Sequence, residues 1–279
     1  MAHAARSNDE IPRPPLARPN LGLVAWALFG VLVAAFLAYG FVHSRAPMLR
    51  FNSPGITLDG TPGSIHTYGS IPELLDGKLG PKVSLSSLPT GPGVVGIGSL
   101  SELRGEIAIV RGVTWLSYAE PGNHTTVERS PTSPESAAFL ALADVPHWRT
   151  ERLDAPIPFD RLPSELEQRA ARAGLDASRP FPVLIDGTFS GIELDVANGP
   201  ALGAAKPTEE RLHDTAVKFS SPSGAGSIVG FVAANEGERI VHAGQSMHLH
   251  IVLPAEKQVG HLDSATIEAG STLSLPVPR

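Results

Sequence analysis

Glycine and proline interrupt this chain so often that they largely determine what it can fold into. The sequence has 28 glycines and 26 prolines among 279 residues, and both residue types favour tight turns. Most apolar segments between them are short and rich in Val and Ile, which is typical of β-strands. The expected strands are GVVGIGSL (93–100), EIAIVRGVTWLSY (106–118), SAAFLALADV (136–145), FPVLIDGTFSGIEL (181–194) and GSIVGFVA (226–233).

Two segments have helical features. IPELLDG (71–77) predicts a short helix, and PSELEQRAARAGL (163–175) predicts a longer one. In the longer segment Ser164 and Glu167 have the spacing of a capping box, and Gly174 is placed to end the helix. We therefore expect an α+β fold that is mainly β, with few helices, in one or two globular domains.

The N-terminal part of the chain predicts a membrane anchor. LGLVAWALFGVLVAAFLAYGFV contains no charged residue, and at about 1.5 Å per helical residue it spans roughly 33 Å, enough to cross a bilayer core. A cleaved signal peptide is the alternative, but the run is longer than a typical signal and lacks a clear A-x-A site. The expected parts are a polar tail (1–20), a single transmembrane helix (21–42), a linker (43–62) and a folded domain (63–279).

Positive charges flank the predicted anchor on both sides. Arg6, Arg13 and Arg18 precede it, and Arg45 and Arg50 follow it. This distribution favours a cytoplasmic N-terminus only weakly. The expected location is a membrane-anchored protein whose soluble domain is extracytoplasmic.

Composition narrows the classes of partner. The net charge is −6, the estimated pI is about 5.9, and there is no cysteine. No basic stripe is present, so nucleic acid is not an expected partner. The absence of cysteine excludes disulfides, thiolate nucleophiles and cysteine-ligated zinc sites.

The segment SMHLHIVLPAEKQVGHLDS (246–264) predicts a β-hairpin that carries a metal site. Strict alternation places His248 and His250 on the same face of the first strand. A turn in the middle of PAEK sets His250 opposite His261 and His248 opposite Asp263, and opposed residues have Cβ atoms about 4.5–5.5 Å apart. Three imidazoles and an open position are typical of catalytic zinc. Asp263 is either a residue that orients His248 or a surface carboxylate.

The spacing of the histidines alone leaves alternatives to a zinc site open. An H-x-H pair also occurs by chance in strands whose histidines bind no metal, and a three-histidine site accepts zinc or another divalent metal such as iron or manganese. A cupin also brings H-x-H to a metal, but its glutamate is expected about four residues after the second histidine. Here that position is Pro254, and the nearest acid, Glu256, lies in the turn.

The same residues resemble the alpha-acetolactate decarboxylase family. HLHIV followed by VGHLDS has the histidine separations of that family's HLHF and GGHVLDF. FPVLIDGTFSGIEL is similar to its IDGTF strand, GSIVGFVA to its GTLVGF strand, and LRGE to its LDGE. These ordered matches cover roughly residues 64 to 264.

The resemblance implies a fold of two closely packed, β-rich subdomains and a zinc-dependent carboxy-lyase. Such an enzyme converts a small-molecule 2-hydroxy-3-keto acid, 2-acetolactate, into acetoin and carbon dioxide. The zinc ligands that carry over are His248, His250 and His261, and the zinc acts as a Lewis acid on the hydroxyl and ketone oxygens. The family's LDGE glutamate matches Glu106, which is expected to take part in proton transfer or to be a solvated carboxylate at a strand start.

Two family features are not matched. The family's substrate-binding arginine falls on Asp195, which would repel a carboxylate, so we consider Arg239 as a replacement. No residue matches the family's C-terminal glutamate, and Glu268 is an unfavourable substitute because its odd offset from His261 turns it away from the metal face.

Three functions are therefore compatible with the sequence. The first is an active, membrane-anchored acetolactate decarboxylase. The second is a relative that retains zinc but binds or transforms another small oxygenated ligand, and the third is a binding or structural domain without metal. The sequence does not indicate an oligomeric state.

Overall fold

The computed structural model describes residues 64–131, 134–233 and 239–277. The predicted tail, anchor at 21–42 and linker lie outside these residues, so they stay predictions. Among the helices in the described ranges, none is both long and apolar enough to cross a membrane.

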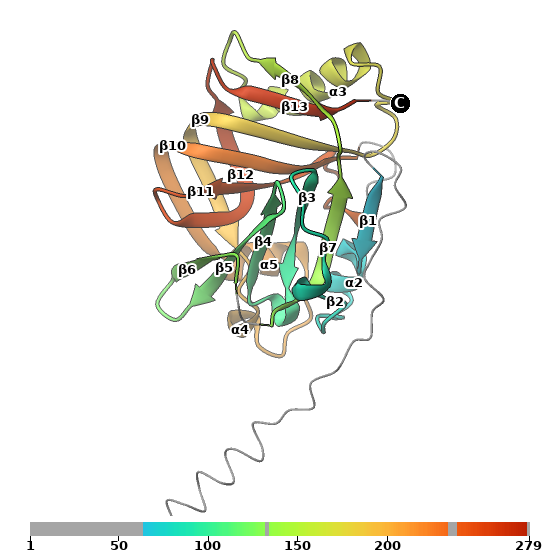
Figure 1. The fold of residues 1–279 in the computed structure, drawn as a ribbon. Helices are drawn as coiled ribbons and strands as arrows, with labels where there is room; N and C mark the ends of the chain where they lie inside the picture. Colours follow the sequence, from blue (N-terminus) through green and yellow to red (C-terminus); the bar gives the residue numbers. More distant parts are fainter. Residues whose placement is uncertain (1–63, 132–133, 234–238, 278–279) are drawn as a thin grey trace, which may run out of the picture. The chain divides into compact units, whose positions relative to one another are not determined.

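The first half of the described chain forms a seven-stranded antiparallel sheet (Figure 1). Its strand order is β1-β7-β3-β4-β5-β6, and β2 also pairs with β7. The described strands are β1 (Ile65–Tyr68), β2 (Val83–Ser84), β3 (Val94–Leu100), β4 (Gly105–Val110), β5 (Val113–Glu120), β6 (His124–Arg129) and β7 (Ser136–Asp144).

The single strand predicted at 106–118 is wrong, because this segment is a hairpin. β4 and β5 are joined by Arg111 and Gly112, whose φ angles are 49° and 75°. Two consecutive positive φ angles are the geometry of the two-residue hairpin turn whose twist matches the flanking strands. Val110 and Val113 are the last paired residues before this turn.

The second half of the described residues forms a six-stranded sheet in the order β10-β11-β12-β9-β13-β8. β9 and β10 also pair with each other along their full length, from Phe181 opposite Val232 to Val196 opposite Val217. The pairings of β9, β10, β11 and β12 therefore form a closed circuit. The strands are β8 (Trp148–Arg152), β9 (Phe181–Val196), β10 (Val217–Val232), β11 (Met247–Leu253), β12 (Gln258–Ile267) and β13 (Thr272–Pro276).

The helices in the described ranges are few and short. Both predicted helices are present, but the predicted capping box is wrong, because the Ser164 hydroxyl donates to the Arg161 carbonyl from inside the first turn. Gly174 ends the longer helix with φ 84°. The α-helices are α2 (Ile71–Leu75), α3 (Leu162–Arg172), α4 (Gly199–Leu202) and α5 (Glu209–Thr215), and the 3₁₀ turns are η1 (Leu85–Ser87), η2 (Ser101–Leu103) and η3 (Phe159–Arg161).

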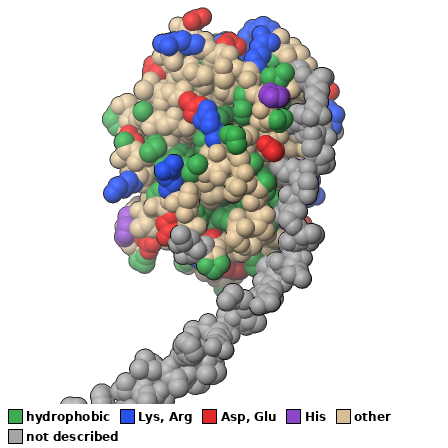
Figure 2. Space-filling model, in the orientation of Figure 1, with side chains coloured by type: hydrophobic (Ala, Val, Ile, Leu, Met, Phe, Trp, Pro, Cys, Tyr) green, Lys and Arg blue, Asp and Glu red, His purple; other side chains and the backbone are tan. Residues whose placement is uncertain are grey.

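A shared apolar core joins the two sheets. It contains Ile97 and Ala108 from the first sheet and Val229, Phe231 and Val252 from the second. Alternation along β10 turns its neighbouring apolar residues to the opposite face, where they form another core with α3. The prediction of a mainly β fold with two closely packed parts is confirmed. Figure 2 shows acidic and basic side chains interspersed over one face of the molecule.

The shared core predicts that Phe231→Ala destabilises the whole fold. Phe231 is fully buried, and removing such a ring leaves a cavity that costs about 3–5 kcal/mol in the free energy of unfolding. Urea unfolding of the purified full-length chain measures this loss. The matched control is Phe219→Ala, at a partly buried position in the same strand, for which we expect a loss of at most about 1.5 kcal/mol. Equal losses for the two variants would contradict the assignment of the shared core.

Candidate metal centre

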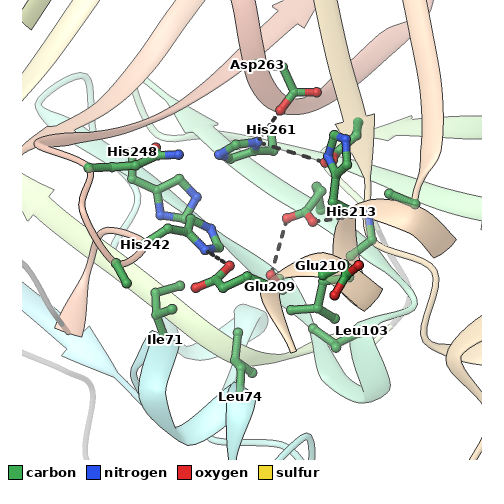
Figure 3. A pocket seen from close by; sticks show the side chains of 18 residues that line it. Ile71, Leu74, Leu103, Glu209, Glu210, His213, His242, His248, His261 and Asp263 are labelled. Carbon is green, nitrogen blue, oxygen red and sulfur yellow. Dashed lines mark hydrogen bonds and ion pairs between the residues drawn. The ribbon is translucent and has the colours of Figure 1, made fainter. Parts of the chain in front are cut away.

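A pocket of about 410 Å³ lies where the two sheets meet α5 (Figure 3). Its apolar wall includes Ile71, Leu74 and Leu103. Among the described residues that line it there is no lysine or arginine. Its titratable lining residues are Glu106, Asp195, Glu209, Glu210, His213, His242, His248, His261 and Asp263.

The paired part of the β11–β12 hairpin has the predicted register. His250 is directly opposite His261, as the sequence indicates. β12 pairs with β9 on its other edge, and a register shift between Leu262 and Ser264 leaves Asp263 unpaired there. The pairing of β12 with β11 ends at His261, so the predicted pairing of His248 with Asp263 is not formed, because the bulge at Asp263 bends the strand at this point.

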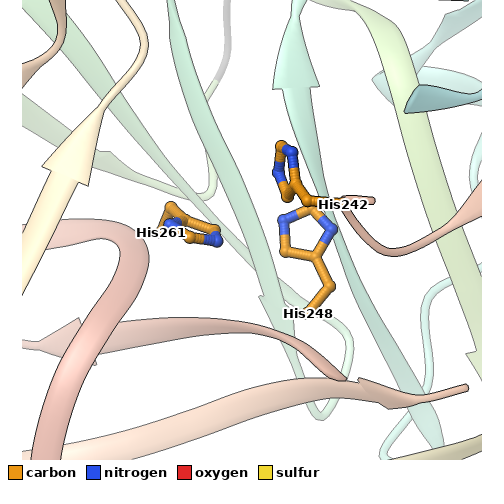
Figure 4. Close-up of side chains that lie close together, drawn as sticks. All are labelled: His242, His248 and His261. Atoms are coloured by element: carbon orange, nitrogen blue, oxygen red, sulfur yellow. The ribbon is translucent and has the colours of Figure 1, made fainter. Parts of the chain in front are cut away.

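Three of the histidines that line the pocket converge. The possible ligand nitrogens of His242, His248 and His261 lie within 4.8 Å of one another (Figure 4). His250 is adjacent, with its ring centroid 5.2 Å from that of His248 and 6.0 Å from that of His261. Its Nε2 lies 3.8 Å from Oε2 of Glu106. The structure thus brings two of the three predicted histidines, His248 and His261, together with His242, whereas the third, His250, lies beside this group and outside it.

The three convergent histidines share the same hydrogen-bonding arrangement. The Nδ1 of each lies at hydrogen-bond distance from an oxygen acceptor, so we assign the ring proton to Nδ1. This leaves the Nε2 lone pair of each ring free to bind a metal, which is the usual arrangement of metal-binding histidines. The pairs are His248 with the Ile240 carbonyl (2.6 Å), His261 with Asp263 Oδ1 (3.2 Å) and His242 with Glu209 Oε2 (2.6 Å).

Burial affects the protonation of the histidines. It lowers the pKa of His248 and His250 well below the usual range, and neighbouring histidines lower it further. Burial acts in the same direction on His261, but the hydrogen bond to Asp263 and the charge of Asp195 raise its pKa overall. Neutral His248 and His250 are suited to metal binding, because a histidine ligand must be unprotonated.

Glu106, the predicted acid, is buried where the two sheets meet. Its Oε2 accepts a hydrogen bond from Ser99 Oγ at 3.3 Å, and its Oε1 accepts one from the backbone N–H of Ala197 at 3.2 Å. Burial, followed by the nearby charge of Asp195, raises the pKa of Glu106 to about 8. The Glu106 carboxyl therefore keeps its proton at neutral pH.

Asp195 faces the pocket from β9, opposite His261. Its carboxylate lies 3.9 Å from Nδ1 of His261 and 3.6 Å from Nδ1 of His213. Burial raises the pKa of Asp195. Together with His213 and Asp263 it forms a second group of possible ligand atoms within 4.8 Å of one another.

The two other residues considered from the sequence lie elsewhere. Arg239 donates a hydrogen bond to Thr67 Oγ1 at 3.4 Å in an exposed position and does not line the pocket. Glu268 accepts a hydrogen bond from Ser190 Oγ and is also outside the pocket. Arg239 therefore does not place a guanidinium in the pocket, and Glu268 does not place a carboxylate there.

Sequence reasoning missed several residues of the pocket. Glu209, Glu210 and His213 come from α5, which was not predicted. Thr208 followed by two glutamates is a recognisable helix start, and its hydroxyl does accept a hydrogen bond from the first turn. His242 lies in a loop, where no periodic pattern could have indicated its direction.

Comparisons with known proteins agree with this architecture. The family profile described as alpha-acetolactate decarboxylase matches residues 65–275. No curated protein sequence matches the chain.

Solved structures of similar fold include two from Bacillus subtilis. The chain is 20% identical to alpha-acetolactate decarboxylase from strain 168, with a TM-score of 0.62, 77% of this chain and 86% of that chain covered. For acetolactate decarboxylase from subspecies spizizenii the identity and coverage are the same and the TM-score is 0.60. A Staphylococcus aureus protein of unknown function, similar to alpha-acetolactate decarboxylase, is 14% identical, with a TM-score of 0.54 over 76% of this chain and 84% of that chain.

The profile covers well over half of the chain, and the solved structures share its fold. The chain therefore belongs to the alpha-acetolactate decarboxylase family.

Proposed function

We propose that this protein is a metal-dependent carboxy-lyase that converts 2-acetolactate into acetoin and carbon dioxide. The observation that carries the proposal is a cluster of imidazoles, with their possible ligand nitrogens within 4.8 Å of one another, beside a buried, protonated glutamate in one pocket. Family membership supports the reaction class.

The donor set fits a divalent metal, and we propose zinc. His248 and His261 have their Nδ1 atoms engaged by oxygen acceptors, and His250 contributes a further buried imidazole whose Nδ1 has no hydrogen-bond partner. Imidazole nitrogens are preferred ligands of zinc. When bound, the metal would supply a Lewis acid for the hydroxyl and ketone oxygens of the substrate.

The pocket supplies a proton where the reaction needs one. Decarboxylation breaks a carbon–carbon bond, releases carbon dioxide and leaves the electron pair on carbon, which must then be protonated. Glu106 retains a proton at neutral pH because its pKa is raised to about 8. We propose that Glu106 delivers this proton, while Ile71 and Leu74 in the pocket wall limit access of water.

A second function is favoured by the charge of the pocket. Five carboxyl groups line it, and no lysine or arginine accompanies them among the described residues. A substrate carboxylate would meet Asp195 without a guanidinium partner nearby. This observation favours a metal-dependent relative that binds or transforms a small oxygenated ligand without a carboxylate, such as a hydroxyketone.

Turnover of racemic 2-acetolactate by the zinc-loaded full-length chain tests the first function. We expect acetoin formation that falls at least roughly 100-fold in His248→Ala, since loss of a metal ligand weakens metal binding at least as much as loss of its supporting residues. His124→Ala, at an exposed position in β6, is the control and should retain the wild-type rate. A folded, zinc-containing wild-type protein without turnover would contradict the decarboxylase and favour the second function.

The pH dependence of stability tests the protonation of Glu106 without any substrate. The native carboxyl holds its proton up to about pH 8, whereas the unfolded one releases it near its ordinary value of about 4.3. Between these values the unfolded state binds fewer protons, so this group makes the free energy of unfolding fall as the pH rises. Urea unfolding of metal-free protein should show Glu106→Gln gaining stability relative to wild type between pH 5 and pH 8. A constant difference across this range would show that Glu106 has an ordinary pKa.

A further inference from the structure

We propose that His242 is a ligand of the metal centre and that Glu209 positions it. This inference rests on the metal site of the proposed function but not on the decarboxylase reaction. It adds a ligand from a loop to the histidines predicted from the β11–β12 hairpin.

The first observation is that the ring of His242 converges with those of His248 and His261. The possible ligand atom of His242 lies within 4.8 Å of those of both His248 and His261. Its ring centroid is 5.1 Å from that of His248 and 5.5 Å from that of His261, edge to face in both cases. Figure 4 shows the three rings gathered around a common space. A single ion between them could be reached by all three with small side-chain movements, because zinc–nitrogen bonds are about 2.0–2.1 Å long.

The second observation is the way the loop before β11 is fixed. Ile240 and Val241 are buried in the core shared by the sheets. The Ile240 carbonyl accepts the hydrogen bond from Nδ1 of His248. The residue two positions later is His242, so one short segment both orients one histidine and carries another. This anchoring reduces the entropy lost when His242 binds an ion.

The third observation is a carboxylate behind the ring. Oε2 of Glu209, in α5, lies 2.6 Å from Nδ1 of His242. A carboxylate that accepts the Nδ1 proton holds the ring in place and makes Nε2 a stronger ligand. His213 also lies on α5, but its Nδ1 is 3.6 Å from Asp195, in the second group of possible ligands. Glu209 therefore links α5 directly to a convergent histidine, whereas His213 reaches His261 only through Asp195.

This arrangement has a structural consequence. α5 belongs to the connection between β9 and β10, whereas His248 and His261 belong to β11 and β12. A metal that binds His242 would tie α5 to the hairpin through Glu209. Zinc should therefore slow backbone hydrogen exchange in α5 (Glu209–Thr215), a region that contains none of the other convergent histidines.

Zinc binding by the full-length chain and four variants tests the proposal. Zinc affinity is measured by competition with a chromogenic chelator, and cobalt(II) substitution reports the ligand field. We expect His242→Ala and His242→Gln each to weaken zinc binding at least about 10-fold and to change the cobalt spectrum, and Glu209→Gln to weaken binding about 10-fold. His124→Ala is the control and should bind zinc as wild type does. Far-UV circular dichroism verifies that each variant is folded.

Hydrogen exchange distinguishes whether His242 binds zinc or only packs beside the zinc site. Zinc should protect α5 in wild type and in His124→Ala, and this protection should be lost in both folded His242 variants. Wild-type affinity, cobalt spectrum and zinc-dependent protection in those variants would overturn the proposal. Zinc binding that depends on His242 without acetoin formation would support it and contradict only the decarboxylase. Absence of zinc binding in wild type would overturn both.

Discussion

The antiparallel pairing of β11 with β12 is the interaction on which the rest of the site depends. It places His250 opposite His261, and alternation keeps His248 on the same face as His250. A slip by one residue would turn these imidazoles into the apolar core. The closed circuit of β9, β10, β11 and β12 prevents such a slip, because each strand is held by neighbours on both sides.

Packing of the two sheets buries the titratable groups of the site. Glu106 comes from β4 of the first sheet but hydrogen-bonds to the backbone of Ala197 at the end of β9 in the second. Burial at this junction keeps its carboxyl protonated, and the same burial keeps His248 and His250 neutral. Neutral His248 and His250 beside a neutral acid are suited to a divalent ion, whose charge would then be the largest in the pocket.

Much of this arrangement could be predicted from the sequence, and the exceptions have physical causes. Alternation in MHLHIVL and the separation of the histidines were sufficient to predict the pairing of His250 with His261, because these signals are local. The partner of Asp263 could not be predicted, since it depends on a bulge at this residue, beyond the end of the β11–β12 pairing. His242 and Glu209 were missed because a loop and a two-turn helix meet only through tertiary packing. Residues 21–42 lie outside the described structure, so the predicted membrane anchor stays a prediction.

We expect the imidazole cluster at the junction of the two sheets to bind one metal ion. Anomalous X-ray scattering at the zinc edge, from crystals of the protein prepared with zinc, tests it most directly. We expect one strong peak in the pocket, about 2.0–2.1 Å from nitrogens of His248 and His261. A fully ordered pocket without a peak, or zinc bound only elsewhere on the chain, would contradict it.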